Sequence, residues 1–374
     1  MWTALAALAL AVWAVLLFAR GGFWRFARTP DAPPPEVWPA VVAIVPARDE
    51  APTIGWVVRA LLAQHYPGSL SVIVVDDGST DGTAVAAGAD TRLQVIEAGP
   101  RPPGWSGKVA AMDAGVRAAG STADLLWFTD ADIVHEPTVL RRLATRIGGR
   151  DLVSEMVRLR IASFWERLLV PAFVFFFAKL YPFPWVGEPA RATAAAAGGS
   201  MLLRRAALER AGGLAAIRGA WIDDCALAAA VKRSGGRLAL DLGPESHSLR
   251  AYPDLPAFWR MVARTAYVEL RHSPLRLAGA VLGMTLTYLV PVAALLAWPL
   301  HDDALAAALG ALAWFAMAVA YVPVLRFHGL SAAWAVTLPA AAALYTAMTV
   351  DSARRHVFGV ATAWKGRRPE MAAP

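Results

Sequence analysis

Ala123-Asp124-Leu125-Leu126-Trp127-Phe128-Thr129-Asp130-Ala131-Asp132 is the most informative run of this sequence. Its centre, Leu125 to Phe128, is short and wholly apolar, which is typical of a strand buried on both faces of an α/β sheet. Two carboxylates follow, at Asp130 and Asp132. Ligands of open α/β sheets bind beyond the carboxyl ends of the strands, and residues i and i+2 of an extended chain point the same way. We therefore expect both carboxylates to reach one site, where their hard oxygens suit Mg²⁺ or Mn²⁺ completed by substrate phosphates.

Similar apolar runs recur on both sides of this stretch. Val41 to Val45 leads into Pro46-Ala47-Arg48-Asp49-Glu50, and Leu70 to Val75 leads into Asp76-Asp77-Gly78-Ser79-Thr80-Asp81. Further strands are predicted at 93–97, 151–160 and 237–241, and helices at 53–64, 108–119, 221–234 and 256–272. Because strands and helices alternate, the sequence predicts a doubly wound, mostly parallel α/β sheet whose acids gather at the carboxyl ends of the strands.

The bulk composition predicts a membrane protein that carries a polar domain. Of 374 residues, 57% are hydrophobic and only 17% are charged, which is too apolar for an ordinary soluble protein. The net charge of +7 comes from scattered Lys and Arg residues without a nucleic-acid-binding motif. We therefore predict no nucleic-acid partner, and we expect the charge to serve anionic lipids and an anionic nucleotide substrate.

Apolar segments at both ends of the chain are the candidates for membrane contact. Residues 1–20 read as a retained N-terminal anchor, and the arginines after it favour a cytoplasmic location for the following domain. The aromatic segment 161–186 predicts membrane-surface helices, with a buried core segment as the alternative. Three apolar runs, at about 277–300, 304–325 and 332–350, predict C-terminal membrane segments over 277–350, followed by a basic tail at 351–374. Three full spans would place that tail outside, so one run is expected to be re-entrant or interfacial.

The ordered motifs resemble those of family 2 (GT-A fold) glycosyltransferases over residues 40–272. The matching positions are Pro46 to Glu50, Val74 to Asp81, Thr129 to Asp132 and Ile222-Asp223-Asp224. Within that family, Pro100 to Lys108, the Phe-rich segment and Ala363 to Arg367 most resemble the hopene-associated glycosyltransferases. This resemblance implies a multi-pass enzyme of the bacterial inner membrane, with a cytoplasmic catalytic domain.

The resemblance also implies a role for each matching residue. Donor-binding residues would be Pro46, Arg48, Glu50, Asp76, Asp77, Lys108 and Asp130, and the divalent metal would be held by Asp130 and Asp132. The catalytic pair would be Asp223 and Asp224, with Asp224 as the general base, and the acceptor side would be formed by Gly198, Gly199, Ser200 and Arg264. The implied reaction is transfer of one sugar, with inversion, from a nucleotide-diphosphate sugar to a lipid acceptor, in the first instance a hopanoid.

Alternatives remain open for several of these residues. Asp130 and Asp223 could each cap a helix, Asp132 and Lys108 could be merely solvated, and Gly198-Gly199 could form a turn. The chain lacks the Q-x-x-R-W motif of polymer synthases, since its helix reads Ala263-Arg264-Thr265-Ala266-Tyr267, which favours a single transfer. A polyprenyl-phosphate acceptor and a non-catalytic scaffold that binds nucleotide sugars are the competing hypotheses. No P-loop or dinucleotide-binding glycine motif is found in the sequence.

Overall fold

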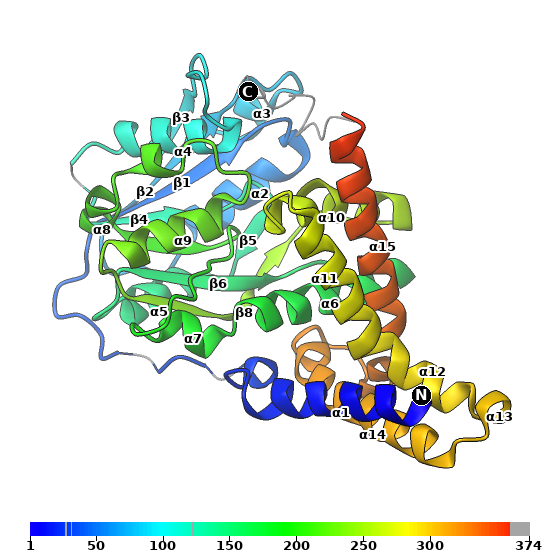
Figure 1. The fold of residues 1–374 in the computed structure, drawn as a ribbon. Coiled ribbons are helices and arrows are strands. Elements are labelled where there is room, and N and C mark those ends of the chain that lie inside the picture. Colours follow the sequence, from blue (N-terminus) through cyan, green and yellow to red (C-terminus); the bar gives the residue numbers. More distant parts are fainter. Residues whose placement is uncertain (27, 31, 122, 360–374) are drawn as a thin grey trace. The chain divides into compact units, whose positions relative to one another are not determined.

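The chain forms two compact units, which we describe separately (Figure 1). The computed structural model describes all residues except 27, 31, 122 and 360–374. The α/β unit contains the described residues of 28–160 and 183–250. The helical unit contains 1–26, 161–182 and 251–359.

A mixed sheet organises the α/β unit. Its strands are β1 (Val41–Ala47), β2 (Leu70–Asp76), β3 (Leu93–Glu97), β4 (Leu125–Phe128), β5 (Ile133–His135), β6 (Leu152–Arg158), β7 (Met201–Arg204) and β8 (Leu238–Ser248). In the described residues they lie in the order β3-β2-β1-β4-β7-β6-β8-β5. The pairs β1–β2, β1–β4, β2–β3 and β6–β8 are parallel, whereas β7 and β5 run antiparallel to their neighbours. The predicted mostly parallel α/β architecture is confirmed.

Helices cover both faces of this sheet. On one face α2 (Ala51–Leu62) and α5 (Val139–Arg146) share a hydrophobic core with β1, β2 and β4. On the other face α4 (Gly107–Ala118) packs on β1 and β2, where Gly115 allows close approach to the side chains of Ile44 and Val75. The remaining helices of this unit are α3 (Thr83–Ala86), α7 (Phe183–Gly187), α8 (Arg205–Arg210), η2 (Leu214–Ile217) and α9 (Asp223–Arg233).

The helical unit collects segments that lie far apart in the sequence. It consists of α1 (Trp2–Phe18), η1 (Phe23–Arg25), α6 (Phe164–Leu180), α10 (Leu255–Glu269), α11 (Pro274–Met284), the π-helical turn η3 (Thr285–Leu289), α12 (Val290–Leu296), α13 (Trp298–His301), α14 (Ala304–Phe327), η4 (Ala332–Thr337) and α15 (Leu338–Val357). α1 packs against α14 and α12, and α10 packs against α15. α10 therefore belongs to this unit, although the sequence interpretation placed it within the catalytic domain at 40–272.

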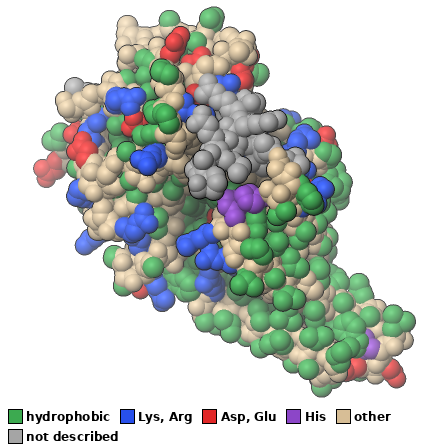
Figure 2. All heavy atoms as spheres, turned by 45° about the horizontal axis from the view of Figure 1, so that its top comes forward, with side chains coloured by type: hydrophobic (Ala, Val, Ile, Leu, Met, Phe, Trp, Pro, Cys, Tyr) green, Lys and Arg blue, Asp and Glu red, His purple; other side chains and the backbone are tan. Residues whose placement is uncertain are grey.

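Three helical stretches of the described residues are long and apolar enough to cross a membrane: Pro274–Leu296, Ala304–Phe327 and Ala332–Val357. Large hydrophobic side chains are exposed here, for example Leu275 at 86% and Phe315 at 66%. Figure 2 shows hydrophobic side chains gathered over this unit. Such a surface is unusual for a water-exposed protein and fits contact with lipid. α1 is apolar but has only 17 residues, so the predicted N-terminal span stays a prediction.

The last helix extends past the segment that we predicted. α15 continues to Val357, whereas the apolar run ends near residue 350. Asp351 forms ion pairs with Arg354 and Arg355, one turn further on, and these pairs support the additional helical turn. The remainder of the predicted basic tail, with Ala363 to Arg367, lies outside the described residues.

Candidate active site

The carboxyl ends of β1, β2 and β4 bring three of the predicted motifs to one edge of the sheet. The backbone hydrogen bonds continue just past the strands: Thr129 N–H donates to Ile44 O at 3.2 Å, and Asp77 N–H donates to Ala47 O at 2.8 Å. The residues after these strands are therefore neighbours, as expected where parallel strands end together. Asp130 follows β4 by two positions.

Hydrogen bonds connect the first two motifs into one loop cluster. Asp76 accepts from Ser79 N–H at 2.8 Å, and Glu50 N–H donates to Thr83 Oγ1 at 2.8 Å. The Arg48 guanidinium donates to the carbonyl of Asp77 and lies 3.9 Å from its carboxylate. These contacts hold the predicted nucleoside-binding residues of the two motifs together in one loop cluster.

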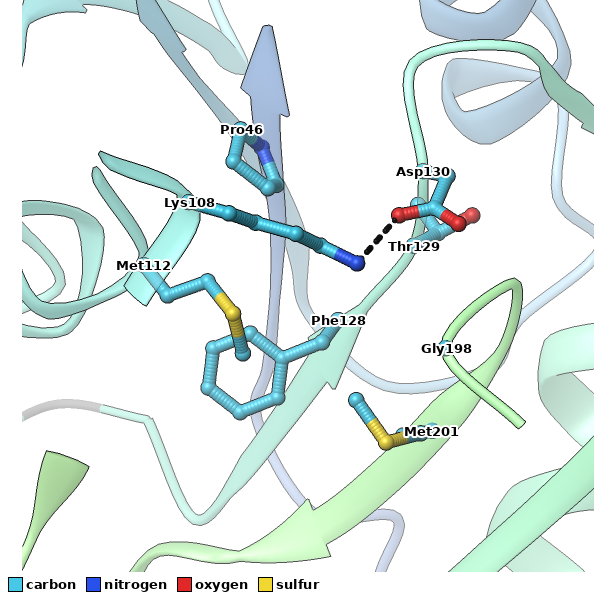
Figure 3. Close-up of a pocket in the computed structure, with 8 residues that line it drawn as sticks. All are labelled: Pro46, Lys108, Met112, Phe128, Thr129, Asp130, Gly198 and Met201. Carbon is cyan, nitrogen blue, oxygen red and sulfur yellow. Dashed lines mark ion pairs between the residues drawn. The ribbon is translucent and has the colours of Figure 1, made fainter. Parts of the chain in front are cut away.

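Lys108 lies between acids from two distant segments. It stands in the first turn of α4, which is capped by the Ser106 side chain. Its Nζ lies 2.8 Å from Asp130 Oδ1, the pair drawn in Figure 3, and 3.1 Å from Asp223 Oδ2. Burial opposes the charged form, yet the two carboxylates raise the pKa of Lys108 above its ordinary range. The ammonium of Lys108 is therefore protonated at neutral pH. The alternative interpretation of Lys108 as a merely solvated residue does not fit these two contacts.

Asp224 is an acid whose pKa is raised strongly, towards the neutral form of the carboxyl group. Its Oδ2 accepts from Gly198 N–H at 2.8 Å, and its Oδ1 accepts from Cys225 N–H at 2.7 Å. Burial and the neighbouring charge of Asp223 raise the pKa of Asp224 to about 7, although Lys108 and both hydrogen bonds act in the opposite direction. Each carboxylate oxygen can accept more than one hydrogen bond. The group can thus receive a proton near neutral pH, which is the property required of a general base.

The loop before β7 approaches this acid closely because it contains glycine. A Cβ at Gly198 would lie 3.3 Å from both Asp224 Oδ2 and Lys108 Nζ. Gly198 lines a small hollow together with Pro46, Lys108, Met112, Phe128, Thr129, Asp130 and Met201 (Figure 3). Gly199 O accepts from Thr129 Oγ1 at 2.9 Å. Ser200 is fully buried, and its Oγ accepts from Trp127 Nε1 at 3.1 Å, so it supports the sheet from within.

Arg250 is a site residue that the sequence interpretation missed. Its Nε lies 2.7 Å from Asp132 Oδ2, and its Nη2 lies 2.6 Å from Glu50 Oε1. Arg250 follows the carboxyl end of β8, whose predicted strand stopped at Asp241 instead of Ser248. The acids were found because they follow the carboxyl ends of predicted strands. A correct prediction of the end of β8 would have identified Arg250 in the same way.

The donor set at Asp130 and Asp132 fits a divalent cation that is completed by substrate. Among the described residues, no group of three or more His, Cys, Asp and Glu side chains is placed to hold a metal. Burial raises the pKa of Asp132, and the negative charges of Asp130 and Glu50 add to that effect while Arg250 opposes it. Two mutually repelling carboxylates would be stabilised by a bound cation, whose other ligands would be phosphate oxygens and water.

The predicted acceptor-side residues are divided between the two units. Arg264 lies on α10 in the helical unit, whereas the other site residues lie in the α/β unit. Its predicted role towards the acceptor stays a prediction.

Known proteins resemble the chain at the levels of family and fold. The model of glycosyl transferase family 21 matches residues 89–370. A mannosyltransferase from Pyrobaculum calidifontis, solved in complex with GDP-Man and Mn²⁺, has a TM-score of 0.60 with this chain. That alignment covers 96% of this chain and 99% of the other at 22% sequence identity, which shows the shared fold.

Curated relatives carry the name N-acetylglucosaminyltransferase. The protein from Mesorhizobium japonicum is 33% identical over 139 residues, which are 36% of this chain and 31% of the relative. The protein from Bradyrhizobium elkanii is 30% identical over 129 residues, which are 33% of this chain and 68% of the relative. The match spans less than a third of the length of the first two relatives, at 31% and 28%.

Proposed function

The chain belongs to glycosyl transferase family 21 and is a glycosyl-transfer enzyme, and from this premise we propose that it moves one sugar, with inversion, from a nucleotide-diphosphate sugar to a membrane lipid. The prediction that the chain belongs to a family of glycosyltransferases is confirmed. The family model that matches the chain is that of glycosyl transferase family 21, whereas the sequence motifs resembled those of family 2 glycosyltransferases.

The observation that carries this proposal is the cluster of Lys108, Asp130, Asp223 and Asp224. It joins the end of β4 to the start of α9, residues far apart in the sequence. Asp224 has a pKa of about 7, whereas the ammonium of Lys108 is held charged. A proton acceptor beside a fixed cation suits a reaction in which a hydroxyl is deprotonated while negative charge develops on a leaving group.

The residues would divide the reaction as follows. Asp224 accepts the proton of the acceptor hydroxyl as its oxygen attacks the anomeric carbon from the side opposite the leaving group. Lys108 stabilises the charge that develops on the departing nucleoside diphosphate. Asp130 and Asp132 would hold Mg²⁺ or Mn²⁺, which supplies further charge neutralisation at the diphosphate when bound. Glu50, Asp76 and Asp77, with Pro46 and Arg48, would orient the nucleoside.

The names of the proteins that this chain resembles suggest which donor sugars to test first. Its curated relatives are named N-acetylglucosaminyltransferases, and the similar mannosyltransferase was solved with GDP-Man and Mn²⁺. We therefore place nucleotide-linked N-acetylglucosamine and GDP-Man first among donors to test.

The acceptor is proposed to be a lipid hydroxyl, with a hopanoid as the first candidate. The exposed apolar surface of the helical unit supports access to lipid. The resemblance of Pro100 to Lys108 and of the Phe-rich segment to hopene-associated enzymes supports the hopanoid. We propose that the enzyme works in the bacterial cytoplasmic membrane with its α/β unit on the cytoplasmic side, in keeping with the arginines that follow residue 19.

A donor and acceptor screen tests the proposal. The full chain in nanodiscs is incubated with each donor, bacterial lipid extract or purified hopanoid, and Mg²⁺ or Mn²⁺, and products are identified by mass spectrometry. We expect a glycosylated lipid that is lost on chelation and lost in both Asp132→Asn and Asp224→Asn. Asp113→Asn, which changes an acid paired with Arg117 elsewhere on α4, is the matched control and should retain activity.

Two outcomes would change the assignment. A phosphate acceptor is already ionised and needs no general base, so activity on polyprenyl phosphate that survives Asp224→Asn would replace the hydroxyl acceptor. Donor binding without transfer to any lipid would contradict the proposed lipid acceptor.

A further inference from the structure

A lysine in the helical unit contacts no acidic side chain within the part of the chain that the structure describes. Lys179 stands in the last turn of α6, and its Nζ donates to Tyr288 Oη at 2.9 Å. It lies 3.8 Å from Met284 Sδ and over the rings of Tyr288 and Phe176, at 4.7 Å and 5.3 Å from their centroids. Among the described residues, none of its contacts is with a carboxylate. A charged amine that packs among aromatic and apolar side chains is costly unless a group of opposite charge or a set of hydrogen-bond acceptors compensates it.

A second cation lies at the same helix end. Arg20 donates from Nε to Lys179 O and from Nη2 to Leu180 O, each at 3.1 Å. These bonds cap the last carbonyls of α6 and hold two positive charges close together. Like charges repel, so an arrangement of this kind gains stability when an anion binds between or beside them.

Tyr288 supplies a further donor at this position. A lysine ammonium can only donate, so its bond to Tyr288 Oη leaves the phenolic hydrogen available, and no described residue accepts it. The ring is fully buried and is held edge-on by Trp13 and by Phe176, at centroid distances of 5.7 Å and 5.5 Å. The hydroxyl is therefore fixed in place beside the ammonium.

The backbone that carries Tyr288 departs from a regular α-helix, and this feature is independent of the side-chain contacts of Lys179. Residues Thr285–Leu289 form a π-helical turn near the middle of the candidate span Pro274–Leu296. Trp13 Nε1 donates to Thr287 O at 2.8 Å, which satisfies a carbonyl of that turn. π-Helical turns are rare and occur frequently at functional sites. Here the turn presents Tyr288 to Lys179.

We propose that Lys179, Tyr288 and Arg20 form a binding site for the phosphate group of a membrane lipid. Phosphate oxygens accept hydrogen bonds from both an ammonium and a phenol, and the second cation complements their charge. Lys179 and Arg20 are partly exposed whereas Tyr288 is fully buried, so a head group would approach through the two cations, with the Tyr288 hydroxyl behind them. Arg20 lies at the end of the apolar helix α1, and Tyr288 lies within a candidate span, so the adjoining surface suits acyl or prenyl chains.

Lipid binding by the full chain in detergent tests this site directly, by native mass spectrometry and without any transfer reaction. The probes are dioleoyl phosphatidic acid, undecaprenyl phosphate, dioleoylglycerol and inorganic phosphate. We expect both phosphate lipids to bind about tenfold or more tightly than dioleoylglycerol, because a charge-assisted hydrogen bond distinguishes them. Lys179→Gln should remove that preference, Lys179→Arg should keep part of it, and Tyr288→Phe should weaken it. Arg276→Gln, which removes an exposed charge from α11, should leave it unchanged.

The two lipid sources are separated within the same experiment. Preference for undecaprenyl phosphate over phosphatidic acid would assign the site to a prenyl-linked substrate, and equal affinity would assign it to bilayer phospholipid. Equal binding of dioleoylglycerol, a similar loss in Arg276→Gln, or binding of inorganic phosphate as tight as that of the lipids would overturn the proposal.

A stability measurement separates ligand binding from a structural role. Lys179→Met replaces the ammonium with an apolar side chain, so in lipid-free detergent its melting temperature should equal or exceed that of the wild type. Phosphatidic acid should raise the melting temperature of the wild type and not that of Lys179→Met, because only a protein that binds the lipid is stabilised by it. A lower melting temperature together with an unchanged lipid effect would mean that Lys179 is structural.

Discussion

Asp224 owes its properties to the residues around it. A carboxylate exposed to water titrates well below neutrality, but burial and Asp223 raise the pKa of Asp224 to about 7. This value suits a base that must be charged before reaction and protonated after it.

The pH dependence of the reaction should report this group. We expect kcat/KM to rise with pH up to about 7 and then to level off, because only deprotonated Asp224 accepts a proton. Asp223→Asn removes a neighbouring negative charge, which should lower the pKa of Asp224 and move the profile to lower pH. Initial rates between pH 5 and pH 9 with saturating metal would measure both. A profile that stays in place in Asp223→Asn would argue against the assignment.

Asp224 should also destabilise the folded protein. Because its folded pKa is raised above the unfolded value, the folded state binds more protons between about pH 4 and pH 7, and stability falls as pH rises through that interval. Asp224→Asn should therefore raise the melting temperature, most clearly above pH 7 and not below about pH 4. Thermal unfolding of both proteins at pH 4.5 and pH 8 measures the difference. A variant less stable than the wild type at pH 8 would show that the charged form is well accommodated.

Arg250 should act mainly on donor binding. It holds Glu50 and Asp132 together, so Arg250→Gln would leave two nearby carboxylates repelling each other and any diphosphate. We expect the donor KM to rise by about tenfold or more with a smaller change in kcat, because a charge-assisted pair contributes on the order of 1.5–3 kcal/mol. Arg250→Lys should recover part of the loss. Arg210→Gln, which disrupts the surface pair with Asp151, is the control; a similar KM in both variants would contradict this role.

Among the secondary-structure elements, α4 links the sheet core to the site. Its first turn carries Lys108, and its last turns pack on β1 and β2 through Gly115. The position of the ammonium thus depends on how closely the helix approaches the sheet.

Enlarging Gly115 should separate α4 from the sheet. A Cβ there would lie 2.5 Å from Ile44 Cγ2 and 3.1 Å from Val75 Cγ2, so Gly115→Ala should cost about 1–3 kcal/mol of stability through overpacking. Transfer activity should fall as well, because Lys108 moves with the helix. Ala118→Val, at an exposed position of the same helix, should change little. Chemical denaturation monitors stability, and unaltered stability in Gly115→Ala would show that the helix can shift without cost.

For the whole molecule, the distribution of apolar surface predicts where the chain resides. Three long apolar helices and many exposed hydrophobic side chains belong to the helical unit, whereas the α/β unit carries the charged site. We expect the full chain to stay in the membrane fraction after high salt and after alkaline carbonate, since both remove proteins that are bound only by charge. Release by carbonate would exclude integral insertion. Extraction by detergent alone would support it.

The amino-acid sequence alone was sufficient for the strands β1 to β4 and β6, for the fold class and for the glycosyltransferase family, but β5 and β7 were not predicted and β8 was predicted too short. Buried strands such as Leu125–Phe128 are continuous apolar runs of sequence. The acids that follow them are also local features, so both can be recognised before the packing of the chain is known. The three long apolar helices were also predictable, because about 20 consecutive apolar residues are recognisable in the sequence without knowledge of packing.

The pairings within the site depended on tertiary packing. Lys108 meets Asp223, and Arg250 joins Glu50 to Asp132, across large separations in the chain that no local pattern encodes. The gathering of α1, α6 and α10 with the C-terminal helices is equally non-local. The physical reason is the sequence separation over which each feature is defined. Hydrophobic periodicity is a pattern of neighbouring residues and can be predicted from them. Ion pairs and shifted pKa values instead arise from side chains that become neighbours only once the elements have packed.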